Sequence, residues 1–439
     1  MTPTSLFKLL PKPIKIPSFG PAVVYGLAGI AFIFGTLVMS LAMPAAEFAE
    51  ATLLVAVCNL AVAAGPAGMN GIVLRYNLRT DAKLLSIGAL VVLIFALLTT
   101  AIVYQVYDLP ISTAAILFTS VLTGGLAFSA IPKLQRRRNF VGAAYIAQSS
   151  AIWMSLAALV MLTGFAGTSW FPLILITAGF IVSCIVSFKT LVSHRHTDTI
   201  AKPRMWKEAM HFWGIALSSE LMSQLERLLI PFLLDIKAVG SFAVVAAVAI
   251  APYRVIELAT ATTLVTRLQS AKSAKSRMQV FYRESLLLIP ISVGGGAVLL
   301  FAGLPICEFV RPDVDDITYT VLAMGAFSGF CRVLTSLSRS VASAFCTPRE
   351  LALVNGSSWF AIAAGVLAAW ALADYGLAGV ILGFSIGWLT RAVLTGILCY
   401  QYLLRDDSPQ YVLMPTNSRS LIRAGDSASA AYSAEAETD

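Results

Sequence analysis

Long apolar runs alternate with short polar links from Pro21 to Leu404. Each run has about 20 residues, which is the length of an α-helix that crosses a bilayer. The pattern therefore predicts about twelve membrane-spanning helices and leaves no room for a large soluble domain. The predicted spans are 21–43, 52–74, 84–105, 113–132, 141–163, 170–191, 212–234, 239–262, 285–305, 317–338, 352–373 and 378–403.

The links between these runs alternate in charge along the chain. Counted from the N-terminus, the even links are basic, whereas the odd links are acidic or neutral, with Lys237 and Arg311 as basic exceptions. Lys and Arg in short loops stay on the cytoplasmic side of a membrane. The alternation predicts a multi-pass protein of the bacterial inner membrane, with both termini in the cytoplasm.

The longest internal link, 193–210, lies at the midpoint of the chain. We therefore expect an all-α polytopic membrane fold with two pseudo-symmetric lobes of six helices each, at 21–192 and 211–404. Two halves of the same orientation are an architecture that many transporters share. A basic cytoplasmic segment, 1–20, precedes the lobes, and we expect the polar tail, 405–439, to be a disordered cytoplasmic extension.

The composition changes the interpretation of the charge. Hydrophobic residues make up 58% of the chain and charged residues 12%, against roughly 25% charged in soluble domains. The net charge of +8 is concentrated in the predicted cytoplasmic links, where it faces anionic headgroups. Membrane lipids, and not nucleic acid, are therefore the expected partners of the basic residues.

Several kinds of chemistry have no motif in this chain. The sequence contains no GxxxxGK[ST] loop, no HExxH motif and no CxxC pair, and its six cysteines are scattered. These patterns hold nucleotide phosphates and metal ions in proteins. We expect no metal site, no cofactor, no catalytic residue and no enzymatic activity.

Ionisable residues inside the predicted spans occur almost entirely in the second half. In the seventh span Glu220, Gln224 and Arg227 follow each other at helical spacing on one face, and Glu226 lies beside that face. An ionised group at the centre of a bilayer costs several kcal/mol, about 3 on insertion scales, unless it is paired or hydrated. These residues are candidates for function or for structural pairing.

The remaining spans of the second half carry further charges. Arg254 and Glu257 in the eighth span are three residues apart, which suits a local ion pair. Arg332 in the tenth span and Arg391 in the twelfth have no carboxylate in their own helices. They either pair across the bundle or line a hydrated cavity. A cationic cavity would favour an anionic substrate, because guanidinium groups bind phosphate through two hydrogen bonds.

Three stretches carry a resemblance to a known family. They are PAAEFAEATLLVAVCNLAVAAGPAGMNGIVLRY at 44–76, the basic link KLQRRRNF at 133–140, and SSELMSQLERLLIPFLLDIKAVGSFAVVAAVAIAPYRVIEL at 218–258. Together with the layout of the spans, they resemble the polysaccharide-transporter flippases, a branch of the multidrug/oligosaccharidyl-lipid/polysaccharide exporter superfamily.

The resemblance implies a V-shaped bundle that moves undecaprenyl-diphosphate-linked oligosaccharide units from the inner to the outer leaflet by alternating access. It also implies polysaccharide polymerase or export machinery as partners. The expected substrate-binding residues are Arg332, Arg391, Arg227 and Arg254, and the expected ion-pairing or coupling residues are Glu220, Glu226 and Glu257.

Two other functions remain open from the sequence. A cation-coupled multidrug extruder of the same superfamily would favour carboxylates in the cavity, and the excess of arginine argues against it. A membrane-embedded glycan polymerase or acyltransferase would usually expose a sizeable outer loop, whereas the longest outer link, 305–316, is short.

Overall fold

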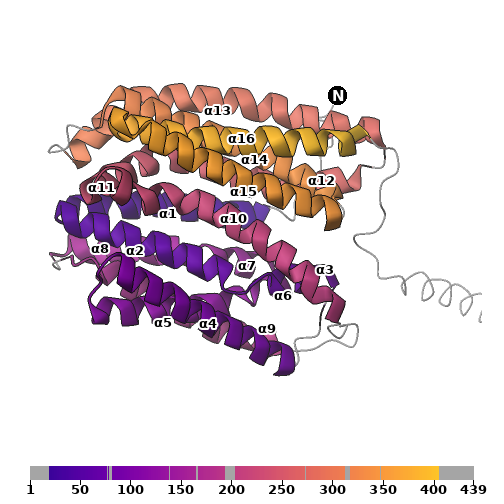
Figure 1. Ribbon diagram of the computed structural model, residues 1–439, viewed down its shortest axis with the longest axis horizontal. Coiled ribbons are helices and arrows are strands. Elements are labelled where there is room, and N and C mark those ends of the chain that lie inside the picture. Colours follow the sequence, from indigo (N-terminus) through magenta and orange to yellow (C-terminus); the bar gives the residue numbers. More distant parts are fainter. Residues whose placement is uncertain are drawn as a thin grey trace, which may run out of the picture.

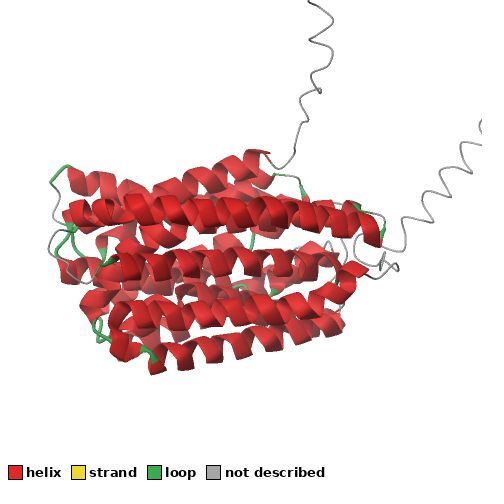
Figure 2. Ribbon diagram, turned by 90° about the horizontal axis from the view of Figure 1, so that it is seen from above, coloured by secondary structure: helices red, strands yellow, loops and turns green. Residues whose placement is uncertain are grey.

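The computed structural model describes residues 19–76, 78, 82–137, 139–164, 167–192, 203–271, 273–311, 317–346 and 348–404 (Figure 1). Within these ranges the chain is helical almost throughout and contains no β-strand (Figure 2). The all-α fold class is confirmed. The N-terminal segment up to residue 18, most of the central link and the tail expected to be disordered lie outside the described residues.

The first half of the chain forms the helices α1 to α9. They are α1 (Phe19–Ala42), α2 (Ala45–Ala64), α3 (Met69–Tyr76), α4 (Ala82–Val106), α5 (Ile111–Phe128), α6 (Ile131–Arg136), α7 (Phe140–Ala147), α8 (Ser149–Leu162) and α9 (Phe171–Val192).

The second half forms α10 to α16 and two short helices of other types. They are α10 (Pro203–Leu233), α11 (Ile236–Val245), the π-helix η3 (Ala246–Ile250), α12 (Ala251–Ser270), α13 (Ala274–Val310), α14 (Tyr319–Phe345), α15 (Pro348–Ala371), the 3₁₀-helix η4 (Ala373–Tyr375) and α16 (Gly376–Leu404).

The predicted spans correspond to these helices with local interruptions. Among the described residues, ten helical segments are long and apolar enough to cross a bilayer, and α7 with α8, bent by 58°, makes an eleventh. The helix α10 is 31 residues long, which exceeds the length that a bilayer requires. It is long enough but not apolar enough to be counted with the other ten, because charged residues occupy its centre. It occupies the position of the predicted seventh span.

The two halves of the chain form two lobes that lie side by side (Figure 1). The first-half helices occupy the lower part of this view and α12 to α16 the upper part, with α10 along the boundary. The boundary is built from α1 packed on α12 and from α2 packed on α10 and α11. Helices of both lobes run along the long axis of the molecule (Figures 1 and 2).

We call the end of the bundle that carries the turns at 43–44, 107–110, 234–235 and 372–375 the acidic end. There the lobes are in contact through Phe48 of α2, which is fully buried and packs near Gly240 of α11. Arg311, after the last residue of α13, donates from Nε to Ser40 Oγ of α1 at 2.9 Å. Its guanidinium lies 5.3 Å from the centre of the Phe48 ring. Arg311, an exception to the charge alternation, therefore joins the two lobes.

The opposite end of the bundle, which we call the basic end, also holds the lobes together. Trp213 of α10 donates from Nε1 to the carbonyl oxygen of Ala64 at 3.0 Å. The chain then turns between α2 and α3 with a positive φ of 76° at Gly68. A Cβ atom at Gly68 would lie 1.8 Å from the carbonyl oxygen of Ala209. Glycine is therefore required there by the backbone conformation and by the close approach of α10.

Candidate functional site

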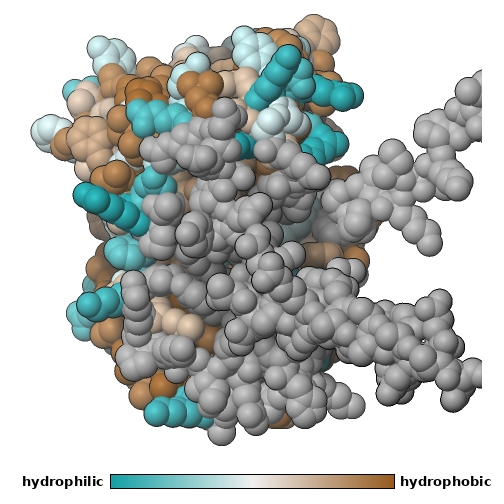
Figure 3. All heavy atoms as spheres, turned by 90° about the vertical axis from the view of Figure 1, so that its right-hand side faces the viewer, coloured by the Kyte–Doolittle hydropathy of each residue, from teal (hydrophilic) through white to brown (hydrophobic). Residues whose placement is uncertain are grey.

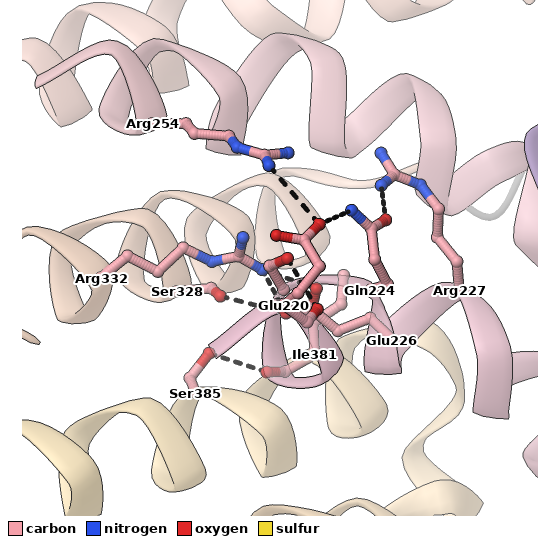
Figure 4. Close-up of polar contacts among 10 residues, drawn as sticks. Glu220, Gln224, Glu226, Arg227, Arg254, Ser328, Arg332, Ile381 and Ser385 are labelled. Carbon is pink, nitrogen blue, oxygen red and sulfur yellow. Dashed lines mark hydrogen bonds and ion pairs between the residues drawn. The ribbon is translucent and has the colours of Figure 1, made fainter. Parts of the chain in front are cut away.

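The polar cluster of the second lobe is organised by α10, whose charged residues point to α12 and α14 (Figure 4). Glu226 accepts two hydrogen bonds from Arg332 Nη2 of α14, at 2.8 Å to Oε1 and 2.6 Å to Oε2. Both side chains are almost fully buried, with 2% and 4% of their surface exposed. Ser328, one turn before Arg332, lies 3.5 Å from the same carboxylate. A buried pair of this kind needs both partners, because a single buried charge is costly.

Trp388 of α16 lies under the cationic side of this pair. The Arg332 guanidinium is 4.7 Å from the centre of the Trp388 ring, a distance at which a cation is attracted to the face of the ring. The guanidinium of Arg391 lies 5.9 Å from the same ring. The two arginines that the sequence could not pair within their own helices thus share one aromatic neighbour.

A second set of contacts connects α10 with α12 (Figure 4). Glu220 Oε1 accepts from Gln224 Nε2 at 2.9 Å and lies 3.9 Å from Arg254 Nη2. Gln224 Oε1 accepts in turn from Arg227 Nη1 at 3.0 Å. Gln224 therefore links Arg227 to the carboxylate that Arg254 contacts directly, with its amide donating on one side and accepting on the other.

A small cavity lies between the lobes beside this set of contacts. Its volume is about 20 Å³, which is enough for about one water molecule. Arg227 and Arg254 line it together with polar residues of the first lobe, Thr36, Thr52 and Asn59. The lobes also meet at both ends of the bundle, and the space between them at this site is small.

Arg391 lies apart from the carboxylates. Its Nη2 donates to Ser219 Oγ at 2.8 Å, and its Nη1 lies 3.8 Å from Met222 Sδ. The side chain is buried, with 3% of its surface exposed. No ion pair joins it to a carboxylate among the described residues. It is a buried cation whose direct contacts, Ser219, Met222 and Trp388, are neutral.

The structure corrects one expected pairing and decides another. The local ion pair between Arg254 and Glu257 is not formed, because Arg254 reaches across to Glu220 of the facing helix. Glu257 has no hydrogen bond or ion pair with the described part of the chain. For Arg332, the structure shows pairing across the bundle, with Glu226.

The four expected arginines do not surround one space in this conformation. Arg227 and Arg254 line the cavity, whereas Arg332 and Arg391 are held behind α10 against Trp388. Sequence reasoning did not identify Trp388 or Ser219 as neighbours of these arginines. A tryptophan three residues before Arg391 is on the same side of α16, and that spacing was the available signal.

No family model matches this sequence, and no curated protein does either. Solved structures do share its fold. A mutant of the Vibrio cholerae MATE transporter VcmN superposes with a TM-score of 0.58 at 15% identity, over 88% of this chain and 98% of that one. The lipid II flippase MurJ in an inward closed conformation gives 0.59 at 13% identity, over 85% and 86%.

A third structure extends the comparison to eukaryotes. The eukaryotic MATE transporter AtDTX14 gives a TM-score of 0.51 at 15% identity, over 87% of this chain and 92% of that one. The chain therefore has the fold of MATE transporters and of MurJ, which agrees with the expected two-lobe bundle.

Proposed function

We propose that this protein is an alternating-access membrane transporter of the multidrug/oligosaccharidyl-lipid/polysaccharide exporter superfamily. More narrowly, we propose a flippase that moves undecaprenyl-diphosphate-linked oligosaccharide units between leaflets for polysaccharide biosynthesis. The fold shared with the lipid II flippase MurJ supports this proposal. The observation that carries it is the pair of arginines, Arg227 and Arg254, that lines the cavity between the lobes.

The arrangement of the lobes fits a rocking motion. Contacts join them at both ends, among them the hydrogen bonds of Arg311 at the acidic end and of Trp213 at the basic end. Separation at one end would widen the cavity toward that side and expose the arginines. A diphosphate could then bind to them, because guanidinium groups bind phosphate oxygens through two parallel hydrogen bonds.

Arg332 and Arg391 differ in the contacts that they would have to break in order to bind a substrate. Arg391 has no carboxylate to leave and could accept an anion once α10 moves. Arg332 would have to leave Glu226, or else stays as the scaffold of the site. Glu220 lies between Gln224 and Arg254, and protonation of such a carboxylate is one way to couple transport to an ion gradient. Glu226 and Glu257 are the further coupling candidates.

A cation-coupled multidrug extruder is the second candidate function. The fold shared with MATE transporters supports it, and so does the presence of three carboxylates, Glu220, Glu226 and Glu257, in the same lobe. The two functions differ in the charge of their substrate. A flippase for diphosphates requires the arginines of the cavity, whereas an extruder for cations requires the carboxylates.

The orientation of the bundle follows from the charge of its links. We place the basic end in the cytoplasm and the acidic end in the periplasm. Reporter fusions after Lys83 and Lys275 should give a cytoplasmic signal, and a fusion after Glu50 should give a periplasmic signal. A periplasmic signal after Lys275 would contradict this orientation.

The test of function is the depletion of the protein in its host. The expected result is accumulation of an undecaprenyl-diphosphate-linked oligosaccharide on the cytoplasmic side, with polymerase and export steps starved of substrate. Wild-type protein should clear it and an Arg227→Gln/Arg254→Gln variant should not, at equal membrane abundance. Lys207→Gln/Arg349→Gln, which removes the same charge from exposed positions, is the matched control. Clearance by the cavity variant would contradict the proposal.

A further inference from the structure

The first three turns of α13 differ from the rest of that helix. The helix has 37 residues and is therefore roughly 55 Å long, whereas a hydrocarbon core is about 30 Å thick. All of its charged residues except Glu308 lie before Ser285, and a mostly apolar stretch follows. A helix of this length places its polar beginning at the level of the lipid headgroups.

A surface groove of about 690 Å³ lies along this polar beginning, and Leu404, the last described residue of α16, forms its other wall. Two rows of α13 side chains line it, each with helical spacing of four residues. One row is Lys275, Gln279 and Arg283, and the other is Met278, Tyr282 and Leu286. The groove thus has a row of hydrogen-bond donors beside a row of apolar and aromatic groups.

The two cations of the groove are free to bind a ligand. Lys275 and Arg283 are exposed and have no hydrogen bond or ion pair with the described part of the chain. The neighbouring carboxylate, Glu284, is already paired with Arg267 of α12. Arg277, by contrast, is buried and donates to the carbonyl oxygen of Tyr402 at 3.3 Å, which holds α13 against α16. The groove therefore carries positive charge on a fixed support.

The apolar side of the groove continues along the membrane-facing surface of α13. Leu286, Leu287 and Ile291 are 65%, 58% and 51% exposed. Tyr282, at the junction between the polar and apolar parts, is 63% exposed, as is usual for aromatic residues at a membrane interface. Figure 3, which faces the basic end, shows hydrophilic side chains at its upper margin, on the side where Figure 1 places α13.

The geometry points to a binding site for one anionic phospholipid. Its phosphate would contact Lys275 and Arg283, its glycerol region would lie at Gln279 and Tyr282, and an acyl chain would follow Leu286 toward Val293, which is 59% exposed and lies on the same face of the helix. Charge complementarity selects an anionic headgroup, and the continuous apolar surface selects a lipid over a free phosphate. The site is separate from the cavity between the lobes and does not depend on the transported substrate.

The test uses the purified full-length protein and native mass spectrometry, with phosphatidylglycerol or zwitterionic phosphatidylcholine as added lipid. The wild type should bind phosphatidylglycerol more tightly than phosphatidylcholine. Because each cation near the surface contributes about a fivefold change, Lys275→Gln/Arg283→Gln should lower this affinity roughly twenty-five-fold. The control Lys207→Gln/Arg349→Gln removes the same charge outside the groove and should leave the affinity unchanged.

A second variant distinguishes a loss of lipid binding from a loss of folding. Gln279→Glu places a carboxylate between the two cations on an exposed face and should also lower the affinity, with an unchanged melting temperature. Equal affinities of the wild type for both lipids would overturn the proposal, and so would equal losses in the groove and control variants. Binding that appears only after deletion of residues 405–439 would assign the groove to the chain's own tail and would equally overturn it.

Discussion

The interiors of the two lobes use different polar chemistry. The buried polar residues of the first lobe are hydroxyls, apart from Lys133 near the basic end, whereas the second lobe buries Glu226, Arg227, Arg332 and Arg391 in its spans. A hydroxyl can donate to the carbonyl oxygen of its own helix, as Ser120 does to Ile116 at 2.8 Å. A buried charge needs a partner, and for Arg332 and Arg391 that partner comes from another helix. The first lobe is therefore satisfied locally, and the second depends on how its helices are placed.

The largest effect on this comparison should come from the buried ion pair. Arg332→Met leaves the Glu226 carboxylate buried without its partner, which should lower the free energy of unfolding by about 3–5 kcal/mol. Thermal melting in detergent and membrane abundance measure the loss. The double variant Glu226→Gln/Arg332→Met should recover most of it. Equal melting temperatures of the wild type and the single variant would show that this pair does not stabilise the lobe.

A second prediction compares glycines at helix contacts in the two lobes. In the second lobe, a Cβ atom at Gly383 would lie 2.2 Å from the backbone nitrogen of Ala369, so Gly383→Ala must separate α15 from α16. In the first lobe, a Cβ atom at Gly124 meets side-chain atoms, with Val62 Cγ2 nearest at 2.4 Å. Side chains can rotate, whereas a helix backbone must shift as a whole.

The expected loss is about 1–3 kcal/mol for Gly383→Ala, and Gly124→Ala should cost less. The difference between their melting temperatures measures it. A larger loss for Gly124→Ala would mean that the first lobe tolerates less repacking than its contacts indicate.

A third, smaller effect is expected from the hydroxyl contacts of the first lobe. Ser120 of α5 contacts Thr177 of α9, and each hydroxyl also donates to its own helix. Ser120→Ala should cost about 1 kcal/mol, because Thr177 keeps its bond to Leu173. A loss comparable with that of Arg332→Met, measured by the same thermal melting, would remove the distinction between the lobes.

The smallest effect on stability should come from Arg391, although it is a buried charge. Arg391→Gln leaves no carboxylate unpaired, and Ser219 keeps its own bond to Ile215 at 2.7 Å. The melting temperature should therefore stay the same or rise. Under the proposed function, transport should nevertheless fall roughly tenfold to a hundredfold, because a charge-assisted contact with the substrate is lost. Unchanged transport would exclude Arg391 from substrate binding.

The sequence predicted the spans well where hydrophobicity alone defines them. It was less accurate at the breaks: the span expected at 141–163 bends at Gln148, and the span expected at 52–74 begins at Ala45 and is interrupted before Met69. Gly65 and Pro66 marked the second break. The bend at Gln148 falls at a short polar stretch, Gln148-Ser149-Ser150, but polar residues inside a span do not by themselves distinguish a bend from a straight helix.

The sequence by itself determined that charges would be buried in the second half and that unpaired cations could not stay in lipid. The tertiary structure decided their partners. Arg254 is three residues from Glu257 yet pairs with Glu220, and Arg332 pairs with Glu226, which is 106 positions away. Span length and charge are local properties of the sequence, and they determine directly how the chain inserts into a bilayer. The choice of partner depends on the rotation and crossing of packed helices, which the hydrophobic pattern does not encode.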